Sequence, residues 1–404
     1  MESPPNVRAE PAELAIERLA DQCVMCGLCL PHCPTYRVGR QEGESPRGRV
    51  ALAKALVAGE HGAHALAHLD NCLACGSCAQ VCPSKVEFVP LLVHARTIAR
   101  RTLGEPALRP RLRALARRPG MLRALMSVRR AGMAHVAQRI ASRHGLAPSA
   151  TRAIARTPRA WLRGQPVAFT PAVGQRRGVL ALFRGCAARV LDADTQQAAV
   201  HVLTHLGYDV HAPSEPHCCG ALALHAGDRD GATHDAGEAR ALFAALGVDA
   251  VVHCTSGCDA TLRQALGVPV HEVCAFVARE PSLELRKEPA RKLRAALMVP
   301  CTQRGIADEA LLLPLLARVP GVEATALPLQ PRCCGAAGLH FADHEAISLP
   351  LREERVAQLA ELAPDVVVTT NIGCRLYLQA GLLEAGLAIP VAHPVALLAE
   401  ALPA

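Results

Sequence analysis

The chain has 404 residues and a formal net charge of +8; half of its residues are apolar and a fifth are charged. This balance is typical of a globular protein of two or three domains and excludes a disordered or collagen-like chain. No apolar run reaches the about 20 residues of a membrane-spanning helix, and the first residues lack the apolar segment of a secretory signal. We therefore expect a cytoplasmic protein, in which the 18 cysteines indicate metal sites rather than disulfide bonds.

Two cysteine runs of identical spacing lie near the start of the chain. CVMCGLCLPHCP and CLACGSCAQVCP both read C-x2-C-x2-C-x3-C-P. Bacterial ferredoxins with two [4Fe–4S] clusters have this spacing, and the fourth cysteine of each run binds the cluster of the other run. The predicted ligands are Cys23, Cys26, Cys29 and Cys82 for the first cluster and Cys72, Cys75, Cys78 and Cys33 for the second. Zinc prefers separated ligand pairs and disulfides need an oxidising compartment, so both alternatives are disfavoured.

The sequence between these runs predicts helices rather than strands. Ser45 and Pro46 match an N-cap and first-turn pair, and RGRVALAKALVAG follows with apolar residues at helical spacing. We therefore expect an α-helical ferredoxin domain over residues 1–99. Arg47 and Arg49 are interpreted either as contacts to a cluster or a partner, or as part of a solvated helix face.

A strongly basic segment follows, over residues 100–165. It holds sixteen arginines, no lysine and one acid, Glu105, so its formal charge is +15 and the rest of the chain carries −7. LRALARR, MLRALMSVRR and HVAQRIASR have the pattern of basic amphipathic helices. We expect a basic helical connector over residues 100–175, which either touches the inner face of the cell membrane peripherally or is a solvated linker. Nucleic acid is not an expected partner, because Trp161 is the only aromatic residue of the segment.

The second half of the chain is an internal repeat of about 115 residues. Cys186 and Cys301 are each followed 32 positions later by the tripeptide CCG. PHCCGALALHAGD aligns with PRCCGAAGLHFAD, and DAVVHCTSGC aligns with DVVVTTNIGC. Agreement of several positions at one period identifies tandem copies of one unit. We place repeat 1 at residues 176–290 and repeat 2 at residues 291–404.

Each repeat alternates short β-branched runs with helical patterns, which predicts an α/β unit with a parallel sheet. The cysteines closely follow the predicted strands, and open α/β sheets bind ligands at the carboxyl ends of their strands. The candidate ligands of one or two additional clusters or metals are Cys186, Cys218, Cys219, Cys254 and Cys258 in repeat 1 and Cys301, Cys333, Cys334 and Cys374 in repeat 2. Some of these cysteines are alternatively small core residues, as we expect for Cys274. His225 and His340 are interpreted either as supporting groups of such a site or as ordinary helix histidines.

The predicted architecture is therefore α+β: a helical two-cluster ferredoxin domain, a basic helical connector and two tandem α/β repeats. No GxGxxG loop that opens a helix after a strand, no phosphate-binding loop and no GxSxG elbow is recognisable. We expect no flavin or nicotinamide and no catalytic residue on this chain. Clusters without a hydride carrier indicate an electron relay.

Two ferredoxin runs followed by two CCG repeats resemble a family of iron–sulfur subunits. It includes those of glycolate oxidase, anaerobic glycerol-3-phosphate dehydrogenase, a lactate-utilisation protein and heterodisulfide reductase. The resemblance is strongest to the glycolate oxidase subunits, in CPTYRVGRQEGESPRGRV, HLDNCLACGSCAQVCPSKV, TSGC, PCTQ, CCGAAG and NIGC. It implies an electron-transfer subunit of a complex that oxidises glycolate to glyoxylate. FAD would be on partner subunits, and electrons would pass towards a quinone or another membrane acceptor.

The resemblance leaves alternatives open. One is the equivalent subunit of a lactate or glycerol-3-phosphate dehydrogenase complex. Another is an enzyme like heterodisulfide reductase, in which five CCG cysteines hold an unusual cluster. Repeat 1 has five cysteines but reads C-x3-C at residues 254–258 instead of C-x2-C, and repeat 2 has Thr370 where repeat 1 has Cys254. This departure favours a relay or a scaffold over disulfide chemistry.

Overall fold

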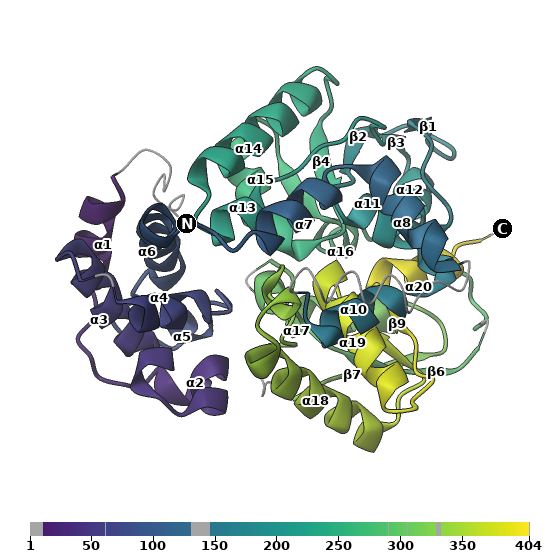
Figure 1. Cartoon of the computed structure of the whole chain (residues 1–404). Coiled ribbons are helices and arrows are strands. Elements are labelled where there is room, and N and C mark those ends of the chain that lie inside the picture. Colours follow the sequence, from purple (N-terminus) through teal and green to yellow (C-terminus); the bar gives the residue numbers. More distant parts are fainter. Residues whose placement is uncertain are drawn as a thin grey trace.

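The computed structural model describes residues 11–60, 62–130, 146–289, 291–304, 306–328 and 333–403. Figure 1 shows a helical region beside two α/β units that lie one above the other, with helix α7 between the three. The described strands belong to two sheets whose central strands are parallel. The predicted fold class, a helical ferredoxin region followed by parallel-sheet repeats, is therefore confirmed.

The ferredoxin region contains helices and no strand among its described residues. Its helices are α1 (Ala12–Ala20), α2 (Pro34–Gly39), α3 (Pro46–Val57), α4 (Ala63–Asp70), α5 (Ser77–Gln80) and α6 (Phe88–Leu103), with 3-10 turns η1 (Leu30–His32) and η2 (Glu42–Glu44). Ser45 caps α3 as predicted, because its hydroxyl accepts the Gly48 N–H at 2.9 Å and Pro46 occupies the first turn. Apolar side chains of α1, α3, α4 and α6 form one core beneath the cysteine runs.

Arg49 corrects the interpretation of α3 as a solvated face. Its side chain is buried and forms an ion pair with Glu44. It also donates to Thr35 Oγ1 at 2.8 Å and to the His68 carbonyl at 2.7 Å, and it lies 3.9 Å from Cys33 Sγ. Because partners surround the guanidinium, its charge is tolerated in the core and fixes the loop that carries Cys33.

The connector is not a solvated linker. Its described helices are α7 (Leu108–Ala116), α8 (Pro119–Arg130), α10 (Pro148–Ala155) and the 3-10 turn η3 (Arg159–Leu162); the predicted helix HVAQRIASR lies outside the described residues. Arg109 of α7 pairs with Asp70 of the ferredoxin region and Asp343 of repeat 2, both at 2.6 Å. Arg113, one turn later, pairs with Asp228 of repeat 1 at 3.2 Å. Helix α7 therefore joins all three parts of the molecule.

Repeat 1 forms a five-stranded sheet in the order β1-β3-β2-β4-β5, in which only the edge strand β1 is antiparallel. The strands are β1 (Phe169–Thr170), β2 (Gly178–Phe183), β3 (Tyr208–His211), β4 (Ala250–His253) and β5 (Val270–Glu272). The helices are α11 (Ala188–Leu191), α12 (Ala193–His205), α13 (Ala221–His225), α14 (Arg229–Ala244), α15 (Asp259–Ala265) and α16 (Val273–Ala278), with the 3-10 turn η4 (Ser256–Cys258).

Repeat 2 forms a four-stranded parallel sheet in the order β7-β6-β8-β9. Its strands are β6 (Leu293–Leu297), β7 (Val322–Ala326), β8 (Val366–Val368) and β9 (Val391–Ala392). Its helices are α17 (Glu309–Ala317), α18 (Glu345–Leu362), α19 (Ile372–Glu384) and α20 (Pro394–Glu400), with 3-10 turns η5 (Cys301–Gln303) and η6 (His340–Ala342). The order β7-β6-β8-β9 reproduces β3-β2-β4-β5, so the two repeats share one topology.

The two repeats also share a hydrophobic core. Leu180 and Val252 of the first sheet belong to the same buried cluster as Leu297 and Val368 of the second. Helix α20, at the end of repeat 2, packs on α12 of repeat 1. Within the described ranges, no helix combines the length and the hydropathy that crossing a bilayer requires.

Candidate metal centres

The first ferredoxin thiol set surrounds a hollow near the protein surface. Its four thiols are those of Cys23, Cys26, Cys29 and Cys82. Met25 and Gly27 have left-handed φ angles of 56° and 81°, and their counterparts Ala74 and Gly76 in the second run have 49° and 67°. The two runs therefore fold alike, with tight turns that direct successive thiols to one side.

This first set is open to solvent. Cys26 is exposed, and Val24 and Leu28 beside it are 68% and 58% exposed. Arg47 lines the hollow, pairs with Glu42 and donates to the Met25 carbonyl at 3.4 Å. Arg47 therefore lies beside the first thiol set, which agrees with the interpretation that it contacts a cluster.

The second ferredoxin set, Cys33, Cys72, Cys75 and Cys78, is more enclosed. Burial and the nearby Cys301 thiol raise the pKa of Cys75 to about 12. Burial and the thiols of Cys75, Cys72 and Cys33 raise the pKa of Cys78 far above its usual value. Metal ligation needs thiolates, and a cationic centre between these crowded thiols would stabilise their ionised form. Both ferredoxin sets therefore fit iron–sulfur clusters in number, spacing and chemistry.

The thiols of repeat 2 lie against this second ferredoxin set. Cys301 and Cys374 follow β6 and β8, at the carboxyl ends of the strands, and Cys333 and Cys334 come from the CCG turn. The sulfur atoms of Cys334 and Cys374 are 2.8 Å apart, and the Gly335 N–H donates to Cys333 Sγ at 3.3 Å. The hydrogen bond with Cys333 and burial raise the pKa of Cys301. The hydrogen bond with Cys301 acts to lower the pKa of Cys333, but the hydrogen bond with Cys334 and burial outweigh it and raise that pKa.

The contact between repeat 2 and the ferredoxin region is apolar and closely packed. Leu73, which follows the ligand candidate Cys72, belongs to one buried cluster with Cys333, Ile347 and Leu351. On the same side, Arg304 donates to Ser77 Oγ at 2.9 Å. Leu73 and its neighbours therefore cover the thiols of repeat 2 on the side of the second ferredoxin set.

In repeat 1 the thiols of Cys186, Cys218, Cys219 and Cys258 line a cavity of about 300 Å³. Hydrogen bonds from the thiols of Cys186 and Cys219 and from the Gly220 N–H hold the pKa of Cys218 below its usual value, against the effect of burial. Arg117, which directly follows α7 and pairs with Asp235, adds positive charge beside this sulfur. The set therefore fits a bound metal or cluster, because four thiols meet at one cavity and metal ligation stabilises their thiolate form.

Cys254, the fifth candidate of repeat 1, lies apart from these four thiols. It packs in the core between the two repeats, together with Ala250, Val252 and Cys274. Alternation along β4 explains this, because residues two apart in a strand face the same side and Val251 faces the other core. The alternation is visible in the sequence and would have predicted the position of Cys254.

A buried group that the sequence did not indicate is formed by Glu272, Cys274 and His393, whose ligand atoms lie within 4.8 Å of one another. The Val395 N–H donates to His393 Nδ1 at 3.1 Å, so the imidazole proton resides on Nε2. That proton faces Glu272 Oε1 across 3.8 Å. The arrangement is that of a buried His–Glu pair, since a metal at Nε2 would require the loss of this proton.

Three histidines lie around the second ferredoxin set and the repeat 1 cavity. His340 Nε2 hydrogen-bonds the Asn71 carbonyl at 3.0 Å, and its Nδ1 contacts Ser348 Oγ at 3.1 Å. His225 lines the repeat 1 cavity, and its carbonyl accepts a hydrogen bond from Arg96. His344, which no sequence pattern indicated, lies between Asp343 at 2.6 Å and Asp70 at 3.1 Å.

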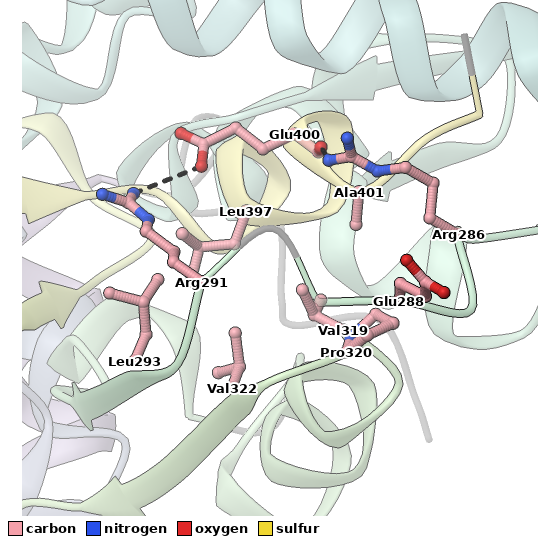
Figure 2. A pocket seen from close by; sticks show the side chains of 10 residues that line it. All are labelled: Arg286, Glu288, Arg291, Leu293, Val319, Pro320, Val322, Leu397, Glu400 and Ala401. Carbon is pink, nitrogen blue, oxygen red and sulfur yellow. Dashed lines mark hydrogen bonds and ion pairs between the residues drawn. The ribbon is translucent and has the colours of Figure 1, made fainter.

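A separate hollow lies far from the cysteines, at the outer end of repeat 2. Figure 2 shows the 3.3 Å ion pair of Arg291 and Glu400 above Leu293 and Val322. Its volume is about 20 Å³, and no cysteine or histidine lines it. This hollow is a surface crevice rather than a site of chemistry.

Comparison with known proteins agrees with this division of the chain. A family model described as a 4Fe–4S dicluster domain matches residues 19–86, which implies two [4Fe–4S] clusters. A second model, described as a cysteine-rich domain, matches residues 180–263 and 295–379. These two matches lie within the repeats identified by their CCG motifs.

Three curated relatives match nearly the whole chain. The glycolate oxidase iron–sulfur subunit of Escherichia coli (strain K12) is 30% identical, with 92% of this chain and 93% of the relative covered. The probable glycolate oxidase iron–sulfur subunit of Bacillus subtilis (strain 168) is 30% identical, with 94% and 93% covered. One of the subunits of fumarate reductase (CoM/CoB) from Methanothermobacter marburgensis is 24% identical, with 94% of this chain and 72% of the relative covered. The chain therefore belongs to the family of glycolate oxidase iron–sulfur subunit-like proteins, in which a 4Fe–4S dicluster domain precedes two cysteine-rich domains.

Proposed function

We propose that this chain is the electron-transfer subunit of a complex that oxidises glycolate to glyoxylate. Partner subunits would carry the FAD that takes electrons from glycolate, and this chain would pass the electrons towards a quinone or another membrane acceptor. The names of the two relatives at 30% identity support the substrate. When bound here, iron–sulfur clusters supply one-electron carriers whose potentials depend on burial, hydrogen bonds and charge.

The observation that carries the proposal is the continuous series of thiol sets. The open first set adjoins the second, since Cys29 and Cys78 interact electrostatically. The second adjoins repeat 2 through Cys75 and Cys301. The two repeats then meet where Ser256 and Thr302, which lie close to Cys258 and next to Cys301, hydrogen-bond at 2.7 Å. Such a series suits a protein that receives electrons at one end and releases them at the other.

We assign the ligands according to these sets. The assignment gives the eight ferredoxin cysteines to two [4Fe–4S] clusters, and the four thiols around each CCG turn to one further metal or cluster per repeat. Cys254 and Cys274 are assigned to the core. The role of the remaining residues is to space the thiols, to exclude water from the second set and to leave the first set accessible.

The surface of α8 supports a peripheral membrane contact. Met121 and Leu125 are exposed on this helix, and Arg118 and Arg123 are exposed beside them. A helix that presents apolar and basic side chains together suits an anionic membrane surface. We therefore propose that the complex works at the inner face of the cell membrane, where a membrane acceptor is within reach.

A second candidate function is disulfide reduction at repeat 1. The relative from fumarate reductase (CoM/CoB) and the access of a cavity to four thiols favour it. The isolated position of Cys254 counts against it, because a five-cysteine set is not assembled. Substrates other than glycolate, namely lactate and glycerol 3-phosphate, remain alternatives for the complex.

Anaerobic purification of the chain, alone and with its flavoprotein partners, tests the proposal. The chain alone should hold at least about eight iron atoms and as much acid-labile sulfide, and more if the repeats are loaded. It should show reducible clusters by EPR without oxidising glycolate or reducing a disulfide. In the complex, glycolate should reduce these clusters faster than lactate or glycerol 3-phosphate does. Zinc in place of iron, or disulfide turnover by the isolated chain, would overturn the proposal.

A further inference from the structure

The cavity that the repeat 1 thiols line is large, and residues of repeat 2 and of the ferredoxin region also bound it. Its volume of about 300 Å³ is roughly twenty times what one buried water needs, which is about 10–15 Å³. It is therefore large enough for a metal group between the four thiols and for a small organic molecule in contact with that group. Of the repeat 2 thiols, only Cys301 reaches this cavity.

Part of the cavity lining is apolar and comes from the connector. Leu112, Leu115 and Ala116 of α7 line it, together with Ala150 and Ile154 of α10. Such a pocket, apolar with a few polar groups at one end, is the usual form of a small-molecule site. The connector therefore closes the open side of repeat 1 with a hydrophobic surface.

Each cationic side chain that lines the cavity already has polar partners, and Arg184 hydrogen-bonds the side-chain oxygens of Gln196 and Gln165. Arg109 binds Asp70 and Asp343, and Arg113 binds Glu105 and Asp228. Arg96 is directed to main-chain carbonyls, which include those of Cys72 and His225. A charged acceptor would compete with these pairs for its counter-ions, whereas an uncharged one leaves them intact.

The histidines that line the cavity add no positive charge. Burial lowers the pKa of His225 to about 4 and also lowers that of His340. Both rings are therefore neutral at physiological pH. The size of the cavity and its largely apolar lining favour an uncharged ring.

Helix α8 both lines the cavity and carries exposed apolar side chains. Leu122 of α8 lines the cavity, and the neighbouring Met121 is 48% exposed at the surface. Leu125, one turn further on, is 41% exposed. These exposed apolar side chains suit contact with a membrane surface close to the cavity.

We propose that this cavity binds the ring of a quinone and that repeat 1 is where electrons leave the chain. The proposal rests on the proposed function, which supplies the reductant. The quinone gains two electrons and two protons and leaves as the hydroquinone. The electrons come from the substrate of the flavoprotein partner through the thiol-bound groups of this chain, and the protons come from water.

A photoreactive azido-naphthoquinone, applied to the intact complex, tests the site directly. Label should be found on peptides of α7, α10 or the CCG turn of repeat 1, and excess menadione should prevent it. Oxidised glutathione, a charged disulfide, should not compete. Labelling confined to other regions, or competition by oxidised glutathione, would overturn the proposal.

A matched pair of substitutions on α7 provides a second test. Ala116→Phe fills the cavity, whereas Ala114→Phe places the same side chain on the exposed face of the same helix. We expect Ala116→Phe to raise the KM for menadione by about tenfold or more and to abolish labelling. Ala114→Phe should have the values of the unmodified complex. Equal KM values for both variants, at equal iron content, would refute the site.

The outcome also separates this inference from the function on which it rests. If glycolate fails to reduce the clusters of the complex by EPR, the proposed function fails. If glycolate reduces them but the quinone label falls elsewhere, only the cavity assignment fails.

Discussion

The two repeats have the same strand order and carry four clustered thiols at matching positions, yet their surroundings differ. In repeat 2 the thiols are covered by Leu73 and its neighbours on the ferredoxin side. In repeat 1 all four thiols face a cavity closed by α7 and α10. The comparison teaches that the repeat supplies a thiol set, whereas the parts of the chain packed on it decide what can reach that set.

The source of the difference is visible at one pair of equivalent positions. Asp228 in repeat 1 and Asp343 in repeat 2 are both bound by arginines of the α6–α7 segment. Arg109, which binds Asp343, also binds Asp70, close to the ferredoxin ligand candidate Cys72. This shared arginine joins repeat 2 to the ferredoxin region by ion pairs, whereas Arg96 joins repeat 1 to it by hydrogen bonds to the carbonyls of Cys72 and His225.

The largest expected effect comes from removing one thiol of each repeat. Cys333→Ser should stop electrons from reaching either repeat in the complex, because the thiols of repeat 2 lie beside the second ferredoxin set at Cys301 and Cys75. Cys218→Ser should affect repeat 1 alone. Freeze-quench EPR after glycolate addition distinguishes the two variants, and each should lose the iron of one site, up to about four atoms if it is a cubane.

One result would contradict the proposed order of electron transfer, in which electrons pass repeat 2 before they reach repeat 1. If the repeat 1 signal appears at the normal rate in Cys333→Ser, electrons reach repeat 1 without passing repeat 2. The iron count serves as the control, because it shows whether the ferredoxin clusters are intact in each variant.

Arg109→Ala tests what holds repeat 2 against the ferredoxin region. The substitution leaves Asp70 and Asp343 without their shared partner in a largely buried position. Removing one side of a buried ion pair costs about 3 kcal/mol, so we expect the free energy of unfolding to fall by about that amount. Arg111→Ala, at an exposed position on the same helix, is the control and should cost about 0.5 kcal/mol or less. Equal unfolding midpoints in urea for both variants would show that Arg109 does not join the two parts.

Much of the fold and of the site could be predicted from the sequence because the signals are local. Three cysteines two residues apart define a ferredoxin turn, and one period of about 115 residues defines the repeats. The alternation of residues along β4 also indicates that Cys254 faces the core between the repeats, although the spacing of the cysteines alone placed it among the candidate ligands. What each cysteine can bind is therefore largely encoded within a few residues of it.

The roles of the arginines could not be predicted in this way. Arg109 and Asp343 are 234 residues apart, and their pairing depends on how separately folded parts pack together. A helical pattern indicates which residues share a face but not what covers that face. The sequence predicts a cluster contact, a partner contact or a solvated face for Arg49, and Arg49 lies beside Cys33. For the connector arginines it predicts a membrane contact or a solvated linker, although several of them hold the interior together.

A smaller, pH-dependent effect is expected from His344, which lies at the same junction. Burial alone would lower the pKa of His344, but hydrogen bonds to Asp343 and Asp70 outweigh burial and raise it. Arg109 and the stacked His340 ring also face it. The histidine therefore stabilises the fold fully below its ordinary pKa of about 6.5, and this contribution is lost as the pH rises through the higher folded value.

Urea unfolding at a series of pH values checks this expectation. The free energy of unfolding should fall as the pH rises from about 6, and His344→Gln should flatten that dependence. His234→Gln alters an exposed histidine of α14 and should leave the dependence unchanged. A profile that keeps its slope in His344→Gln would assign the dependence to another group.

The smallest expected effect concerns Cys254, the candidate ligand of repeat 1 that has no cysteine counterpart in repeat 2. Cys254 packs among core residues of both repeats, so Cys254→Ala should cost about 1 kcal/mol as a small core truncation. It should leave the iron content and the EPR spectrum unchanged, whereas Cys258→Ala should lower the iron content. If Cys254→Ala also loses iron, repeat 1 uses five ligands and repeat 2 four. The difference between the repeats would then lie in the thiol sets themselves, and disulfide reduction at repeat 1 would become the better function.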